Sequence, residues 1–114
     1  MIIEMRTYKI KSGLRATFLD TFEAKVRPEH ERIGMKILGP FLAIEDNDTI
    51  FWMRAFADRE SRERMRNEFY DGKLFQEHLK KNHAPLIEEF HGADRLLSPC
   101  SGCDHSVAQR LFQR

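Results

Sequence analysis

The sequence predicts a single domain of the α+β class, with two helices on one face of an antiparallel sheet. Two observations lead to this prediction. The first is the order of the periodic segments, because apolar residues recur with the spacing of strand, helix, strand, strand, helix and strand in turn. The second is size, since 114 residues of which 41% are hydrophobic match one globular domain.

The first strand and the first helix precede Gly34. Ile2 to Lys11 alternates between apolar and polar residues, which indicates a strand with two unlike faces. Leu14 to Ile33 carries apolar residues four positions apart, so we expect a helix with one apolar stripe. Pro28 lacks a backbone N–H and is expected to bend this helix. Gly34 is expected to end it.

Two further strands follow this helix. Met35 to Glu45 contains Gly39 and Pro40. Since proline cannot donate a hydrogen bond to a sheet ladder, we expect an edge strand with a bulge there. Thr49 to Phe56 is apolar on both faces, which is typical of a central strand.

The remaining elements complete the pattern. Asp58 is expected to cap a charged helix, and a short helical piece from about Leu74 to Asn82 follows it. A last strand is expected from about Ala93 to Ser98. The resulting order, βαββαβ, is the ferredoxin-like arrangement. We therefore predict one domain over residues 1–98 and a loosely ordered tail over residues 99–114.

Composition and motifs exclude several classes of function. The chain carries 19 Lys and Arg against 18 Asp and Glu, so its net charge of +1 gives no long-range attraction for nucleic acid or a membrane. It contains no glycine-rich phosphate loop, nucleophile elbow or HExxH motif, which argues against nucleotide hydrolysis, serine hydrolysis and zinc proteolysis. Glu4 and Arg6 interrupt the N-terminus where a signal peptide would be apolar, so we expect a cytoplasmic protein.

The two faces of the predicted central strand differ in charge. Trp52 and Arg54 share one face of this strand. Alternation in the first strand places Glu4, Arg6 and Tyr8 on the same face of the sheet. We expect this face to point away from the helices, where an open patch of that size would need a cover. A second copy of the chain could supply the cover, so we predict a homodimer whose sheets face each other in a closed, barrel-like sandwich.

The interior of such a barrel is the predicted ligand-binding cavity. Two arginines and one glutamate buried there would leave one positive charge over, which favours an anionic or carbonyl-bearing ligand. The alternative is that these charges only pair with one another or with water. Trp52 could stack on a conjugated ligand, and His30 could act as a general base or only bond to local backbone. The candidate ligand-binding residues are Glu4, Arg6, Tyr8, His30, Trp52 and Arg54.

The cysteines and the other histidines give weaker signals. Cys100 and Cys103, with His105, have the spacing of half a zinc site or a redox pair. No second cysteine pair supplies the remaining ligands, so we expect no metal there. His78 and His83 lie five residues apart, do not share a helix face, and are expected at the surface or its boundary. His78 is expected on the apolar side of its helix, which makes it a candidate axial haem ligand.

Several segments together resemble the NIPSNAP family of the dimeric α/β-barrel superfamily. The segments that carry the resemblance are Glu4–Tyr8, Pro28–His30, Gly34–Phe41, Phe51–Phe56 and Phe69–Tyr70. The resemblance implies a ferredoxin-like fold and a side-by-side homodimer, but it names no reaction. Related barrels include cofactor-independent monooxygenases and haem-degrading enzymes. Phe75 stands where relatives would be expected to carry tryptophan, which could reshape one wall of the cavity.

Two functional hypotheses follow. In the first, the homodimer is an enzyme or a binder of a small molecule; if it catalyses a reaction, analogy with related barrels favours an oxygenation that needs no cofactor. In the second, the chain is a non-catalytic protein-interaction module that uses the charged helix surface from Arg59 to Glu68. Neither hypothesis involves nucleic acid or a membrane.

Overall fold

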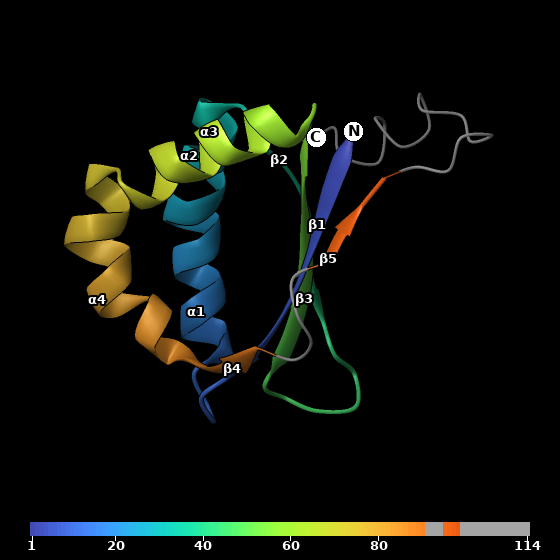
Figure 1. Cartoon of the computed structure of the whole chain (residues 1–114). Helices are drawn as coiled ribbons and strands as arrows, with labels where there is room; N and C mark the ends of the chain where they lie inside the picture. The colour runs from blue at the N-terminus through green and yellow to red at the C-terminus, as the bar shows by residue number, and fades with distance from the viewer. Residues whose placement is uncertain (91–94, 99–114) are drawn as a thin grey trace.

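The fold has two layers, a sheet and a set of helices packed against one of its faces (Figure 1). The computed structural model describes residues 1–90 and 95–98. The elements in chain order are β1 (Ile2–Ile10), α1 (Arg15–Thr21), the π-helical turn η1 (Phe22–Val26), α2 (Arg27–Ile33), β2 (Lys36–Leu42), β3 (Thr49–Phe56), α3 (Arg59–Tyr70), the π-helical turn η2 (Phe75–Leu79), α4 (Lys80–Asn82), the 3-10 turn η3 (Ala84–Leu86), β4 (Ile87–Phe90) and β5 (Arg95–Leu97).

The sheet has the strand order β2-β3-β1-β4, and β5 also pairs with β1. Each of these strand pairs is antiparallel. The predicted α+β, ferredoxin-like fold is therefore confirmed. The predicted last strand matches β5, but β4 also pairs with β1 and was not predicted. With only four residues, placed directly after the turn at Pro85, β4 is too short to show an alternating pattern.

The first helical segment runs without a break through α1, η1 and α2. Pro28 lies in the first turn of α2, directly after η1. Because its ring nitrogen cannot donate to a carbonyl in the preceding turn, the wider π-helical turn accommodates it. Gly34 ends α2 with a φ of 115°, a left-handed conformation that favours glycine. The structure thus places η1 where the sequence predicts a bend, and it confirms the predicted helix end.

Strand β2 lies at one edge of the sheet. Its register against β3 shifts between Leu38 and Phe41, at the Gly39-Pro40 step. This shift confirms the predicted edge strand with a bulge. Strand β3 lies between β2 and β1, which also confirms its predicted central place.

The assignment of the two sheet faces is wrong in the sequence prediction. The Trp52 ring meets Phe22 of η1 and His30 of α2 edge-on, with ring centroids 5.0 and 5.7 Å away. Arg54 is fully buried and hydrogen-bonds to His30. The charged face therefore packs against the helices rather than pointing away from them. The helix side can hold these charges because Glu4 pairs with the buried arginines.

The opposite face of the sheet is apolar and partly exposed. Met5 and Met53 lie opposite each other on β1 and β3, and Phe51 follows on the same face. Phe41, at 49% exposure, stacks beside Phe51 with ring centroids 6.3 Å apart. No helix of the described residues covers this face (Figure 1).

Candidate functional site

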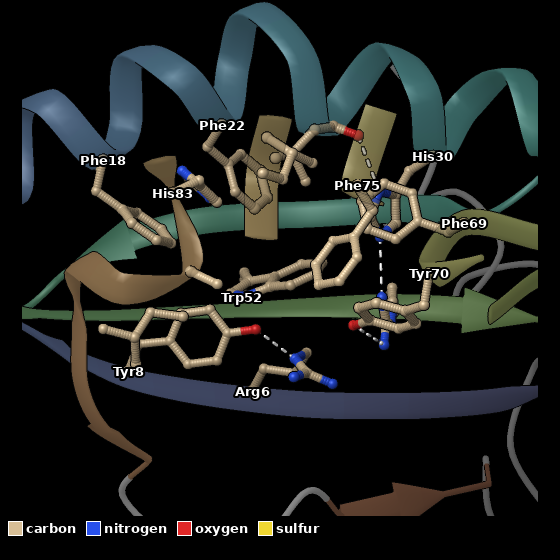
Figure 2. Close-up of a pocket in the computed structure, with 15 residues that line it drawn as sticks. Arg6, Tyr8, Phe18, Phe22, His30, Trp52, Phe69, Tyr70, Phe75 and His83 are labelled. Atoms are coloured by element: carbon tan, nitrogen blue, oxygen red, sulfur yellow. Dashed lines mark hydrogen bonds between the residues drawn. The ribbon is translucent and has the colours of Figure 1, made fainter. Parts of the chain in front are cut away.

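A cavity of about 160 Å³ lies between the sheet and the helices (Figure 2). Its walls are mostly aromatic, with side chains from β1, β3, α1, η1, α3 and η2. An apolar cavity of about 150 Å³ can hold benzene, so this one has room for a single aromatic ring. Its aromatic walls include Phe18, Phe22, Trp52, Phe69 and Phe75. The lining residues with polar side-chain groups, besides Trp52, are Arg6, Tyr8, His30, Arg54, Tyr70 and His83.

Glu4 is the centre of a charged network at this site. Its Oε1 accepts hydrogen bonds from Arg6 Nη1 at 2.6 Å and from Arg54 Nη2 at 2.7 Å and Nε at 3.0 Å. Its Oε2 accepts from Arg62 Nε at 2.9 Å, and Arg66 Nε lies 3.9 Å away. Burial alone would raise the pKa of Glu4, but the charges and hydrogen bonds of Arg54 and Arg6 outweigh it and lower the pKa to about 2. Glu4 is therefore ionised at neutral pH.

The buried arginines also rest on aromatic rings. The Arg54 guanidinium lies 5.4 Å from the ring centre of Trp52 and 5.6 Å from that of Tyr70. The Arg6 guanidinium lies 5.7 Å from the Trp52 ring. Such contacts contribute about 2 kcal/mol when they are desolvated, so the rings help to hold charge inside the fold.

His30 is held on both of its ring nitrogens. Its Nδ1 lies 2.8 Å from the carbonyl oxygen of Val26, which can only accept, so Nδ1 carries the proton. Its Nε2 then accepts from Arg54 Nη1 at 2.9 Å. Burial, followed by the charge of Arg54, lowers the pKa of His30 to about 3. Of the two roles considered for His30, the structure supports local hydrogen bonding rather than general-base catalysis.

The two tyrosines at the site differ in acidity. Burial raises the pKa of Tyr8 to about 12, and its hydroxyl accepts from Arg6 Nε at 2.5 Å. Burial would also raise the pKa of Tyr70, but the charges of Arg54 and Arg6 outweigh it and lower that pKa. The Tyr70 hydroxyl accepts from Arg54 Nη2 at 3.1 Å, which leaves its own proton available to a ligand.

Two buried nitrogens of cavity-lining residues have no hydrogen-bond partner in the described part of the chain. These are Nε1 of Trp52 and Nδ1 of His83. The His83 ring stacks on Phe18 with centroids 3.9 Å apart and planes 18° apart. Burial lowers the pKa of His83 to about 4, so its imidazole is neutral at pH 7. Since an unpaired buried polar atom costs free energy, a ligand that formed a hydrogen bond with either nitrogen would remove that cost.

The structure brings together the six candidate residues selected from the sequence, although on the helix side of one chain rather than between two sheets. Five of them line the cavity, and Glu4 lies behind it, bonded to Arg6 and Arg54. That they bind a ligand stays a prediction. Tyr70 and His83 were missed as cavity residues, and the expectation that His83 lies at the surface or its boundary is wrong, because it is buried. A signal for His83 was present, because it follows the apolar Phe75 and Leu79 at intervals of four residues.

Three other expectations have different outcomes. His78 is exposed and does not line the cavity, so it is wrongly placed as a haem ligand on an apolar side. The helix surface from Arg59 to Glu68, considered from the sequence as an interaction surface, is partly directed inward, because Arg62 and Arg66 approach Glu4. Cys100 and Cys103 lie outside the described residues.

Within residues 1–90 and 95–98, no three His, Cys, Asp or Glu side chains gather as a metal site would require. No helix in the same ranges is long and apolar enough to cross a membrane.

The fold and the cavity define a ferredoxin-like α+β domain that encloses a mainly aromatic pocket between its sheet and its helices. The chain belongs to the NIPSNAP family, whose model matches residues 3–101.

Solved structures share this fold. A NIPSNAP domain protein from Burkholderia xenovorans is 20% identical, with a TM-score of 0.77 over 91% of this chain and 99% of its own. A NIPSNAP family protein from Agrobacterium tumefaciens is also 20% identical, with a TM-score of 0.74 over 88% and 86% of the two chains. A protein described as an antibiotic biosynthesis monooxygenase is 13% identical, with a TM-score of 0.64 over 88% and 99%. No curated protein matches this chain at a significant level.

Proposed function

We propose that the cavity binds one small planar molecule that carries a carbonyl or anionic oxygen. The observation that carries this proposal is Trp52, which lines a pocket the size of one aromatic ring and whose buried Nε1 is a donor without a partner among the described residues. Indole nitrogen can only donate, so the complementary ligand atom is an acceptor. Arg6 and Arg54 also line the pocket, and their positive charge favours an oxygen that bears partial or full negative charge.

The fold is similar to that of an antibiotic biosynthesis monooxygenase, which suggests one class of reaction to test once a ligand has been found. That class is cofactor-independent oxygenation. His83 is the candidate proton acceptor in it, because its imidazole is neutral and its Nδ1 is unpartnered among the described residues. The alternative of an interaction module on the Arg59 to Glu68 surface has less support, because Arg62 and Arg66 are directed to Glu4.

The first test uses benzaldehyde and toluene as probes, of which only benzaldehyde carries a carbonyl group. Trp52→Phe removes the indole donor and keeps an aromatic ring. We expect benzaldehyde affinity to fall about tenfold, the value of one hydrogen bond, while toluene affinity changes little. Titration followed by protein NMR measures both affinities. Equal loss for both probes, or no binding of benzaldehyde to the wild-type chain, would contradict the proposal.

We also propose that two chains pair through the apolar sheet face that carries Met5, Phe51 and Met53. Support comes from the partial exposure of these side chains and from the exposed Phe41 beside them. Burying such a face removes apolar area from water, which stabilises a dimer. The cytoplasmic location expected from the sequence also stays a prediction.

Met53→Asp is expected to convert this dimer to a monomer, because an unpaired buried carboxylate costs several kcal/mol. Light scattering after gel filtration at micromolar concentration measures the mass. Thr17→Asp adds the same charge at an exposed position of α1 and is expected to leave the dimer intact. A wild-type mass equal to one chain would refute the dimer.

A further inference from the structure

We propose that Arg62 and Arg66 of α3 form a subsite for a carboxylate or phosphate group at the Tyr70 end of the cavity. This inference deepens the proposed function and rests on it, because it adds an anionic group to the planar ligand. The anion site itself can be tested without any pocket ligand.

The spacing on α3 creates the subsite. Arg62, Arg66 and Tyr70 lie four residues apart and therefore share one face of the helix. That face turns toward the sheet, since Arg62 Nε reaches Glu4 Oε2 at 2.9 Å. Two like charges at this spacing destabilise a helix by a few tenths of a kcal/mol, so a shared counter-charge has to offset them.

Glu4 supplies too little of that counter-charge. Its single carboxylate lies within 4.0 Å of the guanidinium groups of Arg6, Arg54, Arg62 and Arg66. Even when Arg6 is left out of the count, three positive charges share one negative charge. Neither Arg62 nor Arg66 has a second carboxylate within that distance in the described residues. The surplus charge is partly desolvated, because the side chains of Arg62 and Arg66 are only 19% and 31% exposed.

The two arginines also retain unused donors. A guanidinium carries five N–H groups, and Arg62 uses only Nε in its bond to Glu4. Arg66 Nε is buried without a hydrogen-bond partner in the described part of the chain, because Glu4 Oε2, 3.9 Å away, is too distant. Carboxylate and phosphate oxygens suit such planar donor groups better than neutral acceptors do.

Tyr70 connects this subsite to the cavity. The Arg66 guanidinium lies 5.5 Å from the centre of the Tyr70 ring, and the Tyr70 side chain lines the cavity. Figure 2 shows Tyr70 at the end of the cavity near His30, with its hydroxyl bonded to Arg54. A ligand whose ring occupies the cavity and whose acidic substituent extends past Tyr70 would therefore meet both sites.

The test uses inorganic phosphate and acetate as probes of the anion site alone. NMR titration of the wild-type chain is expected to shift the side-chain signals of Arg62 and Arg66 with either probe, and the probe with the lower dissociation constant indicates which group the subsite prefers. The double variant Arg62→Gln/Arg66→Gln is expected to lose at least about tenfold in affinity, because two charge-assisted hydrogen bonds are removed. Arg64→Gln removes the same kind of charge at an exposed position of α3 and is expected to keep wild-type affinity.

Two results would overturn the proposal. One is saturable binding that Arg64→Gln weakens as much as the double variant does, which would indicate attraction to net charge alone. The other is the absence of shifts at Arg62 and Arg66 when both probes reach millimolar concentration in buffer without chloride. A conservative variant, Arg66→Lys, guards against a folding defect, because it keeps the charge and should retain part of the affinity. If benzaldehyde fails to bind while phosphate binds, the pocket proposal fails and the anion site stands.

Discussion

Replacing Glu4 with glutamine is expected to lower the free energy of unfolding by about 3–5 kcal/mol, as breaking a buried ion pair from one side does. The Glu4 carboxylate is fully buried and accepts hydrogen bonds from Arg6, Arg54 and Arg62. Glutamine keeps the size of the side chain and one acceptor oxygen. It removes the negative charge, so the fully buried Arg54 is left without its counter-charge. Urea denaturation at pH 7 measures the change.

A matched control for this variant is Glu88→Gln. Glu88 lies on β4, about half exposed, 3.6 Å from Lys9. Exposed ion pairs contribute less than about 1 kcal/mol, so this variant should lie near the wild type. A Glu4→Gln variant no less stable than Glu88→Gln would show that the arginines are hydrated well enough without Glu4.

The Glu4 carboxylate also makes the stability of the chain depend on pH. The pKa of Glu4 is lowered from 4.5 to about 2 in the folded chain. A depressed pKa in the folded state means that the stabilisation is fully present above pH 4.5 and is lost as the pH falls toward 2. Glu4→Gln should therefore remove this part of the acid dependence as well as lowering stability at pH 7.

The order of the elements along the chain, apart from β4, follows from the sequence, but the predicted faces of the sheet are reversed, and the reason is physical. Alternation shows which residues of β1 and β3 share a face, because side chains point to opposite sides at every step. It does not show which face meets the helices when both faces carry apolar residues. Met5 and Met53 are as suitable for a core as Trp52 is. The charge of Arg54 favours an outward face, but pairing with Glu4 makes burial possible.

The interior position of Arg62 and Arg66 could not be predicted from α3 alone. A helix rich in arginine and glutamate usually has a solvated charged face. What directs these two arginines inward is Glu4, which lies 58 and 62 positions earlier in the chain and meets them only after β1 joins the sheet. His83 is a different case, because its spacing from Leu79 is enough to place it on the apolar stripe.

The corrected assignment of the sheet faces makes ligand binding and dimerisation two separate proposals, whereas the sequence prediction made ligand binding depend on the dimer. A cavity between two sheets would exist only in the dimer. The observed cavity lies between the sheet and the helices of one chain, and the described residues of that chain suffice to form it. Ligand binding and dimerisation can therefore succeed or fail independently. A monomeric Met53→Asp variant remains suitable for the ligand and phosphate titrations.

Acidification from pH 7 to pH 4 is expected to destabilise the chain by about 3 kcal/mol through His83 alone. Burial lowers the pKa of His83 from 6.5 to about 4 in the folded state. The unfolded chain therefore takes up a proton at higher pH than the folded chain does. The stabilisation that comes from a neutral His83 is fully present above pH 6.5 and declines as the pH falls. Below pH 4 this contribution no longer changes with pH. His30, whose pKa is lowered to about 3, adds a second decline that extends to lower pH.

His83→Phe isolates the first of these contributions. Phenylalanine keeps a flat ring against Phe18, where the imidazole stacks, and cannot take up a proton. Between pH 7 and pH 4, we expect the free energy of unfolding of the variant to fall by about 3 kcal/mol less than that of the wild type. The pH dependence that remains is due mainly to His30. Urea denaturation at half-unit pH steps measures both profiles. His78→Gln, at an exposed position, should reproduce the wild-type profile. Parallel profiles for His83→Phe and wild type would mean that water reaches the His83 ring freely, and His83 would then be a poor candidate for the proton acceptor of the pocket.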